Sequence, residues 1–354
     1  MNLLTLKRRM QEAGMDAFFV TSEVNQRYLL DYPFTDGMLL ITEKRAFMVT
    51  DFRYLEEAKK YADPAFEVVT PELRTAFILD VLKADGVKTI GFEDGSLTVA
   101  EFRSMQERYE GYTFIPAGDM LESIREIKLP QEVEYMKRAQ AITDAAFTHI
   151  LKVITPNMTE TEVALELEFE MRRLGADGLA FETIAVSGDA SALPHGHPRD
   201  EKLHRGFLTM DYGARYKGYC SDMTRTIVIG RADDEMRHLY NTVLRAQTEA
   251  LAAIRPGADC AAVDKVARDI IDGNGYAGCF GHSLGHGVGL FIHERPGLST
   301  RGGGRLLQAG NVVTDEPGIY ISGKYGCRIE DMVLVTEDGN YNFTKSSKEL
   351  IEIL

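Results

Sequence analysis

The second half of the chain contains one arrangement of elements twice, with about one hundred residues between the copies. Ile154–Asn157, with the sequence I-T-P-N, joins two predicted helices, and a predicted hairpin that carries two aspartates follows. Ile254–Gly257, with the sequence I-R-P-G, joins two more helices, and a predicted hairpin with two glutamates follows. We interpret the copies as an internal repeat in which each half supplies two helices and one hairpin. The alternative is a coincidental similarity between two helix–proline–helix elements.

The first predicted hairpin carries Asp211 and Asp222. Runs rich in strand-forming residues lie on both sides of the turn between these aspartates. If the turn is centred between Tyr216 and Lys217, the two aspartates are directly opposed on one face. Their Cβ atoms would then be roughly 4.5–5.5 Å apart.

The second predicted hairpin carries Glu316 and Glu330, with its turn near Gly323. Centring the hairpin on Gly323 places the two glutamates opposite one another on one face as well. A slip of one residue would move one member of the pair to the other face, so the prediction depends on the register.

A glycine-flanked histidine completes a candidate metal site with these four carboxylates. Such a hard, oxygen-rich set can hold two divalent ions, and it favours manganese or cobalt, with zinc or iron also open. Two metal ions ~3.5–4 Å apart polarise a carbonyl and generate hydroxide at neutral pH, which indicates metal-assisted hydrolysis. Any one of these carboxylates alone would be read as a solvated strand end, so the prediction rests on the combination. The predicted ligands are Asp211, Asp222, His286, Glu316 and Glu330.

The charge of the chain limits its partners. The formal net charge is −14 and the sequence pI is about 5.1. Both values argue against binding to nucleic acid or to anionic membranes. No apolar stretch approaches the length of a membrane span, and the N-terminal charge order is the reverse of a secretory signal. We therefore expect a cytoplasmic protein.

We predict two domains and a linker. Residues 1–122 alternate helix and strand signals, which indicates a small α/β domain, and without a glycine-rich phosphate loop we assign it no nucleotide. Residues 123–130 form a linker that we expect to be basic and exposed. For residues 131–354 we predict an α+β domain, in which a curved antiparallel sheet is backed by helices. The metals would lie in the concavity between its pseudo-symmetric halves.

Several motifs resemble the pita-bread metallopeptidases, and most closely their proline-specific branch, aminopeptidase P and prolidase. The resemblance covers the chain from about Gln131 to the C-terminus, and it extends more loosely to the N-terminal domain through Val20–Leu29. It implies an exopeptidase that cleaves the bond before proline in Xaa-Pro dipeptides or at the N-terminus of short peptides. The matching segments are Ser191–Gly196, Asp211–Thr226, Gly281–Pro296, Thr314–Tyr320 and Arg328–Asp331.

The resemblance also implies a role for each metal ligand. Asp211 would chelate one metal, and His286 and Glu316 would hold the other. Asp222 and Glu330 would bridge both metals, with a hydroxide between the ions. Glu316 would accept a proton as that hydroxide attacks.

Three further histidines match active-site residues of the family that are not metal ligands. His195, His282 and His293 would stabilise the tetrahedral intermediate and help to protonate the leaving nitrogen, a contribution typically worth about 10²–10⁴-fold. Arg328 would orient a carboxylate of the site. The remaining histidines are expected to be surface or packing residues, and they are His149, His197, His204 and His238.

The sequence departs from the family pattern at two positions. Phe207 stands where an acidic residue is common, and Asp315 stands between Thr314 and Glu316 where an aliphatic residue is usual. Strand alternation predicts that Asp315 points away from the metals. Neither residue is a predicted ligand.

Alternatives to a proline-specific peptidase share the same scaffold. A methionine aminopeptidase has the same ligand set, but the upstream α/β domain and the H-E-R-P segment disfavour it. A non-catalytic pita-bread binding module or a metal-independent, creatinase-like hydrolase would lack ligands, and all five are present. The resemblance further implies a homodimer whose N-terminal domain packs against the partner chain and helps to wall the cleft.

The choice between dipeptidase and aminopeptidase P stays open. A strict dipeptidase needs a cation for the proline carboxylate. Arg295, Arg301 and Arg305 are candidates in and around the glycine-rich loop 297–304, although each could equally be solvated.

Overall fold

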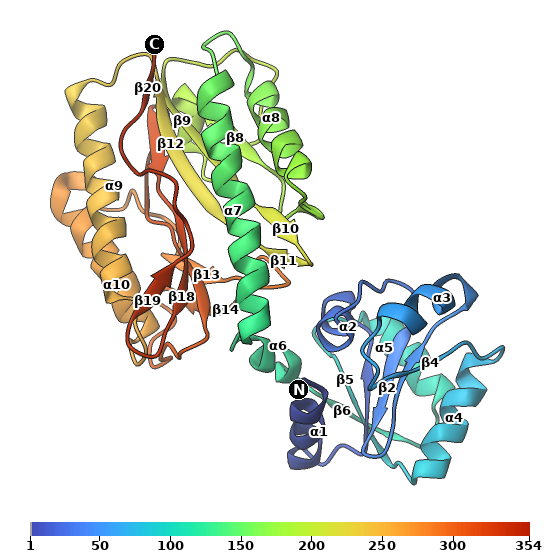
Figure 1. Ribbon diagram of the computed structural model, residues 1–354. Helices are drawn as coiled ribbons and strands as arrows, with labels where there is room; N and C mark the ends of the chain where they lie inside the picture. The colour runs from blue at the N-terminus through green and yellow to red at the C-terminus, as the bar shows by residue number, and fades with distance from the viewer. Residues whose placement is uncertain (1) are drawn as a thin grey trace. The chain divides into compact units, whose positions relative to one another are not determined.

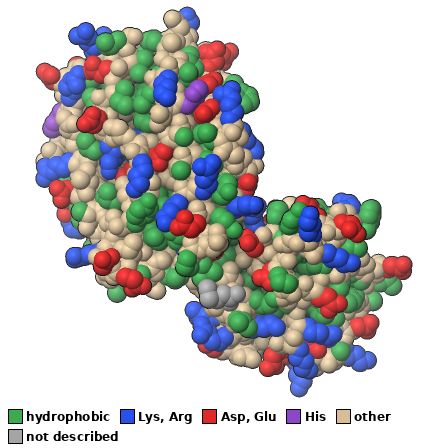
Figure 2. All heavy atoms as spheres, in the orientation of Figure 1, with side chains coloured by type: hydrophobic (Ala, Val, Ile, Leu, Met, Phe, Trp, Pro, Cys, Tyr) green, Lys and Arg blue, Asp and Glu red, His purple; other side chains and the backbone are tan. Residues whose placement is uncertain are grey.

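The computed structural model describes residues 2–354, and the chain forms one unit that ends at Arg125 and another that extends from Glu126 to Leu354. Within residues 2–354, no helix is both long and apolar enough to cross a membrane. On the face shown in Figure 2, acidic and basic side chains are interspersed, so the net charge of −14 is not gathered there in one patch.

The first unit is built on one six-stranded mixed sheet with the strand order β4-β3-β2-β1-β5-β6. The neighbours β1–β5, β5–β6 and β3–β4 are parallel, whereas β1–β2 and β2–β3 are antiparallel. All four residues of β1 are buried, as expected for a central strand between helices. The strands are β1 (Ala17–Val20), β2 (Met38–Thr42), β3 (Ala46–Val49), β4 (Glu67–Val69), β5 (Thr89–Phe92) and β6 (Thr113–Pro116). The helices are α1 (Asn2–Glu12), α2 (Glu23–Leu30), α3 (Phe52–Tyr61), α4 (Arg74–Asp85), α5 (Val99–Arg108) and α6 (Met120–Arg125).

The expectation of an exposed linker was wrong for its charged residues, although Ile127 and Pro130 are exposed. Arg125, Glu126 and Lys128 are all buried. The reason is that charged groups elsewhere in the second unit neutralise this segment: Glu126 forms an ion pair with Arg305, and Lys128 forms one with Glu294. Burial of a charge is tolerated when it is paired in this way.

The second unit contains two helix pairs and the strands that carry the predicted site, as Figure 1 shows. Helices α7 and α8 pack together, and so do α9 and α10. One buried apolar cluster extends from Ile142 to Ile229, and another consists mainly of second-half residues together with Phe207 and Val228 of the first half. The helices are α7 (Pro130–Val153), α8 (Glu160–Arg173), α9 (Asp234–Ala253) and α10 (Cys260–Ile271).

The strands of the second unit form two larger sheets and two smaller ones. A four-stranded sheet has the order β20-β12-β9-β8, and a five-stranded sheet has the order β14-β13-β15-β18-β19. The first-half strands are β7 (Gly178–Leu179), β8 (Ile184–Ser187), β9 (Gly206–Tyr212), β10 (Ala214–Tyr216), β11 (Tyr219–Cys220) and β12 (Met223–Ile229). The others are β13 (Gly285–Gly287), β14 (Glu294–Leu298), β15 (Val312–Asp315), β16 (Gly318–Ile321), β17 (Tyr325–Arg328), β18 (Asp331–Val335), β19 (Asn340–Asn342) and β20 (Glu352–Ile353).

Candidate metal centre

The first hairpin forms with a different centre from the predicted one. Asp211 pairs with Thr224 rather than with Asp222, because the turn is centred between Lys217 and Gly218. These two residues have φ values of 51° and 84°, and a two-residue turn of type I′ requires positive φ at both positions and favours glycine at the second. The prediction that the two aspartates are directly opposed was therefore wrong.

The correction leaves both aspartates on the same face of the hairpin. Moving the centre by one residue moves the cross-strand pairing by two, and side chains alternate with a period of two. Asp222 therefore lies diagonally across from Asp211, opposite Gly213. A Cβ atom on Gly213 would lie 2.0 Å from the carbonyl oxygen of Ser221, so only glycine permits this close backbone approach.

The second hairpin has the predicted register. Strands β16 and β17 pair Gly318 with Arg328, and strands β15 and β18 pair Asp315 with Asp331. The two ladders share one register, which places Glu316 opposite Glu330 between them. The prediction for this pair is confirmed.

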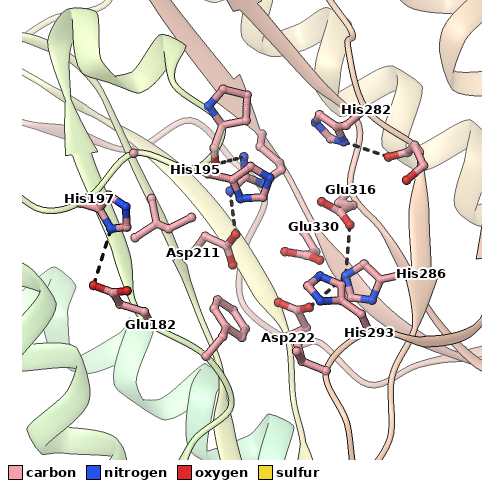
Figure 3. Close-up of a pocket in the computed structure, with 17 residues that line it drawn as sticks. Glu182, His195, His197, Asp211, Asp222, His282, His286, His293, Glu316 and Glu330 are labelled. Carbon is pink, nitrogen blue, oxygen red and sulfur yellow. Dashed lines mark hydrogen bonds and ion pairs between the residues drawn. The ribbon is translucent and has the colours of Figure 1, made fainter. Parts of the chain in front are cut away.

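Side chains from both hairpins and from β13 converge on one cavity. Ligand atoms of Asp222, His286 and Glu330 all lie within 4.8 Å of one another. The Nε2 atom of His286 is 3.5 Å from Asp222 Oδ2 and 3.4 Å from Glu316 Oε1. Figure 3 shows Asp211 on the other side of this cluster, and it lines the same cavity.

The electrostatics of the cluster fit divalent cations. Burial, together with repulsion between the neighbouring carboxylates, raises the pKa values of Asp222 and Glu330 well above their ordinary range. Burial is also the main cause that raises the pKa of Glu316 to about 8. Asp211 Oδ1 is buried and has no hydrogen-bond partner within residues 2–354. Bound cations would balance this concentration of acidic groups.

His286 is prepared to act as a neutral ligand. Burial lowers its pKa to about 4, so the ring is uncharged at neutral pH. Its Nδ1 lies 3.0 Å from the carbonyl oxygen of Gly287, an acceptor, so Nδ1 carries the hydrogen. The lone pair of Nε2 then faces Asp222 and Glu316, which is the arrangement that a metal-binding imidazole requires.

Hydroxyl groups that the sequence analysis did not identify orient two of the carboxylates. Thr224 donates a hydrogen bond of 2.7 Å to Glu330 Oε2, and Thr314 donates one of 3.1 Å to Glu316 Oε1. The spacing of two residues from Asp222 to Thr224 and from Thr314 to Glu316 was the available signal, because it places each threonine on the ligand face.

Tyr320, which the sequence analysis did not single out, contacts His282. Tyr320 accepts a hydrogen bond of 2.8 Å from Arg328, and its hydroxyl lies 2.9 Å from His282 Nε2. The Nδ1 atom of His282 lies 2.9 Å from the carbonyl oxygen of Ser283, so Nδ1 bears the hydrogen and Nε2 accepts from Tyr320. Burial, with a contribution from Arg328, lowers the pKa of His282 to about 4.

The other predicted active-site histidines also line the cavity. The ring of His293 packs edge-on against His286, with centroids 4.4 Å apart, and His195 lies on the opposite wall (Figure 3). His197 lines the cavity too and forms an ion pair with Glu182, so the expectation of a plain surface or packing residue was incomplete. The histidines that do not line it are His149, His204 and His238.

Both departures from the family pattern lie away from the predicted metal ligands. Asp315 accepts a hydrogen bond of 3.0 Å from Gln247 of α9, so it points to the helix side of the sheet, as strand alternation predicts. Phe207 is buried in the core between the rings of Tyr240 and Tyr325.

The three arginines considered for substrate binding do not line the cavity in the described chain. Arg305 is paired with Glu126, and Arg295 and Arg301 are exposed. Arg328 does line the cavity, but its guanidinium is bound to Asp211, Thr224 and Tyr320.

Comparisons with known proteins identify both units of the chain. Residues 134–337 match metallopeptidase family M24, and residues 3–127 match the creatinase/prolidase N-terminal domain. An uncharacterized peptidase, YqhT, of Bacillus subtilis is 40% identical over 99% of both chains.

Solved structures resemble the chain over nearly its whole length. A Bacillus anthracis Xaa-Pro dipeptidase is 43% identical, with a TM-score of 0.95 and 99% of both chains covered. A Thermotoga maritima X-Pro aminopeptidase is 35% identical, with a TM-score of 0.92 over 98% of this chain and 100% of that one. The predicted pita-bread fold with a preceding α/β domain is confirmed. The family match spans more than half of the residues of this chain, so the chain belongs to metallopeptidase family M24.

Proposed function

We propose that this M24 metallopeptidase is an exopeptidase that hydrolyses the bond before proline, in Xaa-Pro dipeptides or at the N-terminus of short peptides. The main observation is the convergence of four carboxylates and a neutral histidine in a cavity of about 400 Å³, beside four further histidines. A cavity of this volume suits a short peptide. The names of the dipeptidase and aminopeptidase relatives support this substrate class.

The ligand set is proposed to hold two divalent ions, with manganese as the first choice because four of the five ligands offer hard oxygen. Asp211 would bind one ion, His286 and Glu316 the other, and Asp222 and Glu330 would be shared between them. Bound ions of this kind supply a nucleophilic water and polarise the scissile carbonyl.

The residues of the chain would supply the proton transfers. Glu316 lines the cavity beside the proposed ions and would accept the proton that the attacking water loses. His195 and His293 line the cavity and would donate hydrogen bonds to the developing oxyanion or a proton to the leaving nitrogen. The nitrogen before proline leaves as a secondary amine, so it needs that proton. Tyr320 would keep His282 in one tautomer.

The test compares Xaa-Pro dipeptides with Xaa-Pro-Xaa tripeptides, after the purified protein has been dialysed against chelator and Mn²⁺ restored. Faster turnover of dipeptides assigns a dipeptidase, and faster turnover of tripeptides an aminopeptidase. Matched Xaa-Ala peptides serve as the control. Equal turnover of Xaa-Ala and Xaa-Pro substrates would contradict the proposed specificity, and turnover at full rate without metal would contradict the metal centre.

The homodimer and the cytoplasmic location stay predictions from the sequence. The resemblance assigns the N-terminal unit to dimerisation and to the exclusion of long peptides. Light scattering on the full chain and on a chain that begins at Ile124 tests the first role, and a series of Xaa-Pro peptides of increasing length tests the second. An unchanged association state and length profile would remove both roles from this unit.

A further inference from the structure

A buried ion pair involves the residue that follows the cavity-lining His293. Lys128 Nζ is 3.1 Å from Glu294 Oε2, and only 1% and 4% of the two side chains are exposed. Lys128 precedes α7 by two residues, and Glu294 follows His293 directly. The desolvation of two charges makes such a pair a weak source of stability, so its value lies in fixing geometry.

Glu294 closes the turn that carries His293. Its Oε1 accepts a hydrogen bond of 3.0 Å from the backbone N–H of Phe291. A Cβ atom on Gly289 would lie 2.4 Å from Glu294 Oε2, so the carboxylate fills the inside of the turn between these residues. One carboxylate therefore binds the backbone of the turn with one oxygen and Lys128 with the other.

The same turn is tied to the first metal-ligand hairpin. The backbone N–H of Cys220 donates a hydrogen bond of 2.8 Å to the carbonyl oxygen of Gly289. Cys220 precedes the predicted ligand Asp222 by two residues. The turn is thus held from one side by the Asp222 hairpin and from the other by Lys128.

Lys128 is itself fixed through its backbone. Its N–H donates a hydrogen bond of 2.9 Å to the carbonyl oxygen of Gly310, and Asn311 binds the carbonyl oxygen of Glu126. The position of its ammonium group is therefore fixed, and the ion pair holds the turn with Glu294 in place relative to it.

We propose that Lys128 and Glu294 are positioning residues that hold His293 against His286 and toward the substrate. The inference rests on the proposed function, because His293 is assigned a role in peptide hydrolysis there. The His293 side chain is exposed and lines the cavity, and its ring contacts His286 on one side, so this packing alone does not fix its position. The position of the ring must therefore be fixed by the backbone of His293 and of the cavity-lining Ile292.

The first experiment uses Glu294→Gln in the full chain. The amide keeps an acceptor for Phe291 but removes the charge that Lys128 faces, so the turn loses its fixed point. We expect kcat for an Xaa-Pro substrate to fall about 10- to 100-fold, because a displacement on the order of 1 Å has that effect. KM and the metal content should change little. The resonances of the His293 ring, assigned by their loss in His293→Ala, should shift.

A double variant separates position from stability. Lys128→Met with Glu294→Leu replaces the pair by apolar side chains, so the melting temperature should return to or exceed that of the wild type. Because the leucine side chain offers Phe291 no acceptor, the turn is no longer held and kcat should remain low. Asp85→Asn, which weakens an ion pair with Arg45 in the first unit, is the control for lost stability and should keep wild-type kcat.

Two results would overturn the proposal. One is a double variant with wild-type kcat and unshifted His293 resonances. The other is an equal loss of kcat in Asp85→Asn, which would make the effect one of stability. If the wild type hydrolyses no Xaa-Pro peptide, the proposed function fails, and the His293 resonances of Glu294→Gln still decide whether the pair sets the ring.

Discussion

Arg328 lies against Asp211, and its Nη2 donates a hydrogen bond of 2.6 Å to Asp211 Oδ2. The same guanidinium binds the hydroxyl oxygens of Thr224 and Tyr320 at 3.0 and 2.8 Å. It therefore joins a ligand of the first hairpin to a residue that orients a ligand of the second. Asp211 Oδ1 is buried without a hydrogen-bond partner among residues 2–354, so it is left for the predicted metal site.

Arg328→Lys should weaken metal binding at Asp211. An ammonium group cannot reproduce the planar fork that bridges three partners. Because loss of a group that orients a ligand typically lowers metal affinity about 10- to 100-fold, we expect a loss in that range. Isothermal titration of the metal-free protein with Mn²⁺ measures it, and unchanged affinity would remove Arg328 from this role.

Asp222→Asn should abolish activity without unfolding the protein. The amide keeps the shape of the side chain but lacks the charge needed to hold two cations. Metal content per chain should fall while the circular dichroism spectrum stays unchanged. Since repulsion from Glu330 and Asp211 contributes to the raised pKa of Asp222, the metal-free variant should melt at a higher temperature than the metal-free wild type. Full activity in this variant would contradict the assignment of the ligands.

The stability of the metal-free protein should fall as pH rises from 6.5 to 8. The pKa of Glu316 is about 8 in the folded protein against an ordinary value of 4.5, so in this window the folded state holds protons that the unfolded state has lost. The free energy of unfolding therefore decreases with pH. The buried His282 and His286 have lowered pKa values of about 4 and act in the opposite direction, but this effect fades as the pH rises above their ordinary pKa of 6.5.

Thermal melts with and without Mn²⁺ test this pH dependence. Bound cations take the place of the protons, so the melting temperature should no longer fall with pH when metal is present. The increase in melting temperature on adding metal should be largest at pH 8. A metal-free melting temperature that rises between pH 6.5 and 8 would contradict the expectation.

His293→Ala should retain metal and lose most of kcat. His293 packs against His286 without being one of the predicted ligands, so its loss removes stabilisation that develops only in the transition state. KM should change little. Metal analysis of the purified variant is the decisive control, because a lost metal would make His293 a ligand.

The second hairpin could be predicted well from the sequence because the residue that sets its register lies in its own turn. Gly323 has a φ of 71°, so a glycine at the centre of the turn is needed, and it sets the register of Glu316 and Glu330. The first hairpin has the same kind of signal in Gly218, but the adjacent Lys217 also adopts positive φ. Positive φ is uncommon in lysine, so the residue gave no signal for the position of the turn.

Contacts between distant parts of the chain could not be predicted in this way. Lys128 and Glu294 are 166 positions apart, and a lysine before a helix normally indicates an exposed segment. The sequence similarly identifies Tyr320 only as a strand residue, because the contacts of its hydroxyl with His282 and Arg328 depend on the fold. Residue types and spacing identified the candidate ligands, whereas the groups that orient them depend on the tertiary structure.

Glu182 should influence which residue is accepted before proline. Its carboxylate lies in the cavity wall apart from the metal ligands and pairs with His197 at 3.5 Å (Figure 3). Glu182→Gln should lower kcat/KM for Lys-Pro relative to Leu-Pro. Both side chains of the pair are 78% exposed, so solvent screening limits the change to about five-fold or less. Glu201, which pairs with His204 away from the cavity, supplies the matched control Glu201→Gln. In the wild type, kcat/KM for Lys-Pro relative to Leu-Pro should decrease as salt is added. Equal effects of Glu182→Gln on both substrates would show that this carboxylate does not read the substrate side chain.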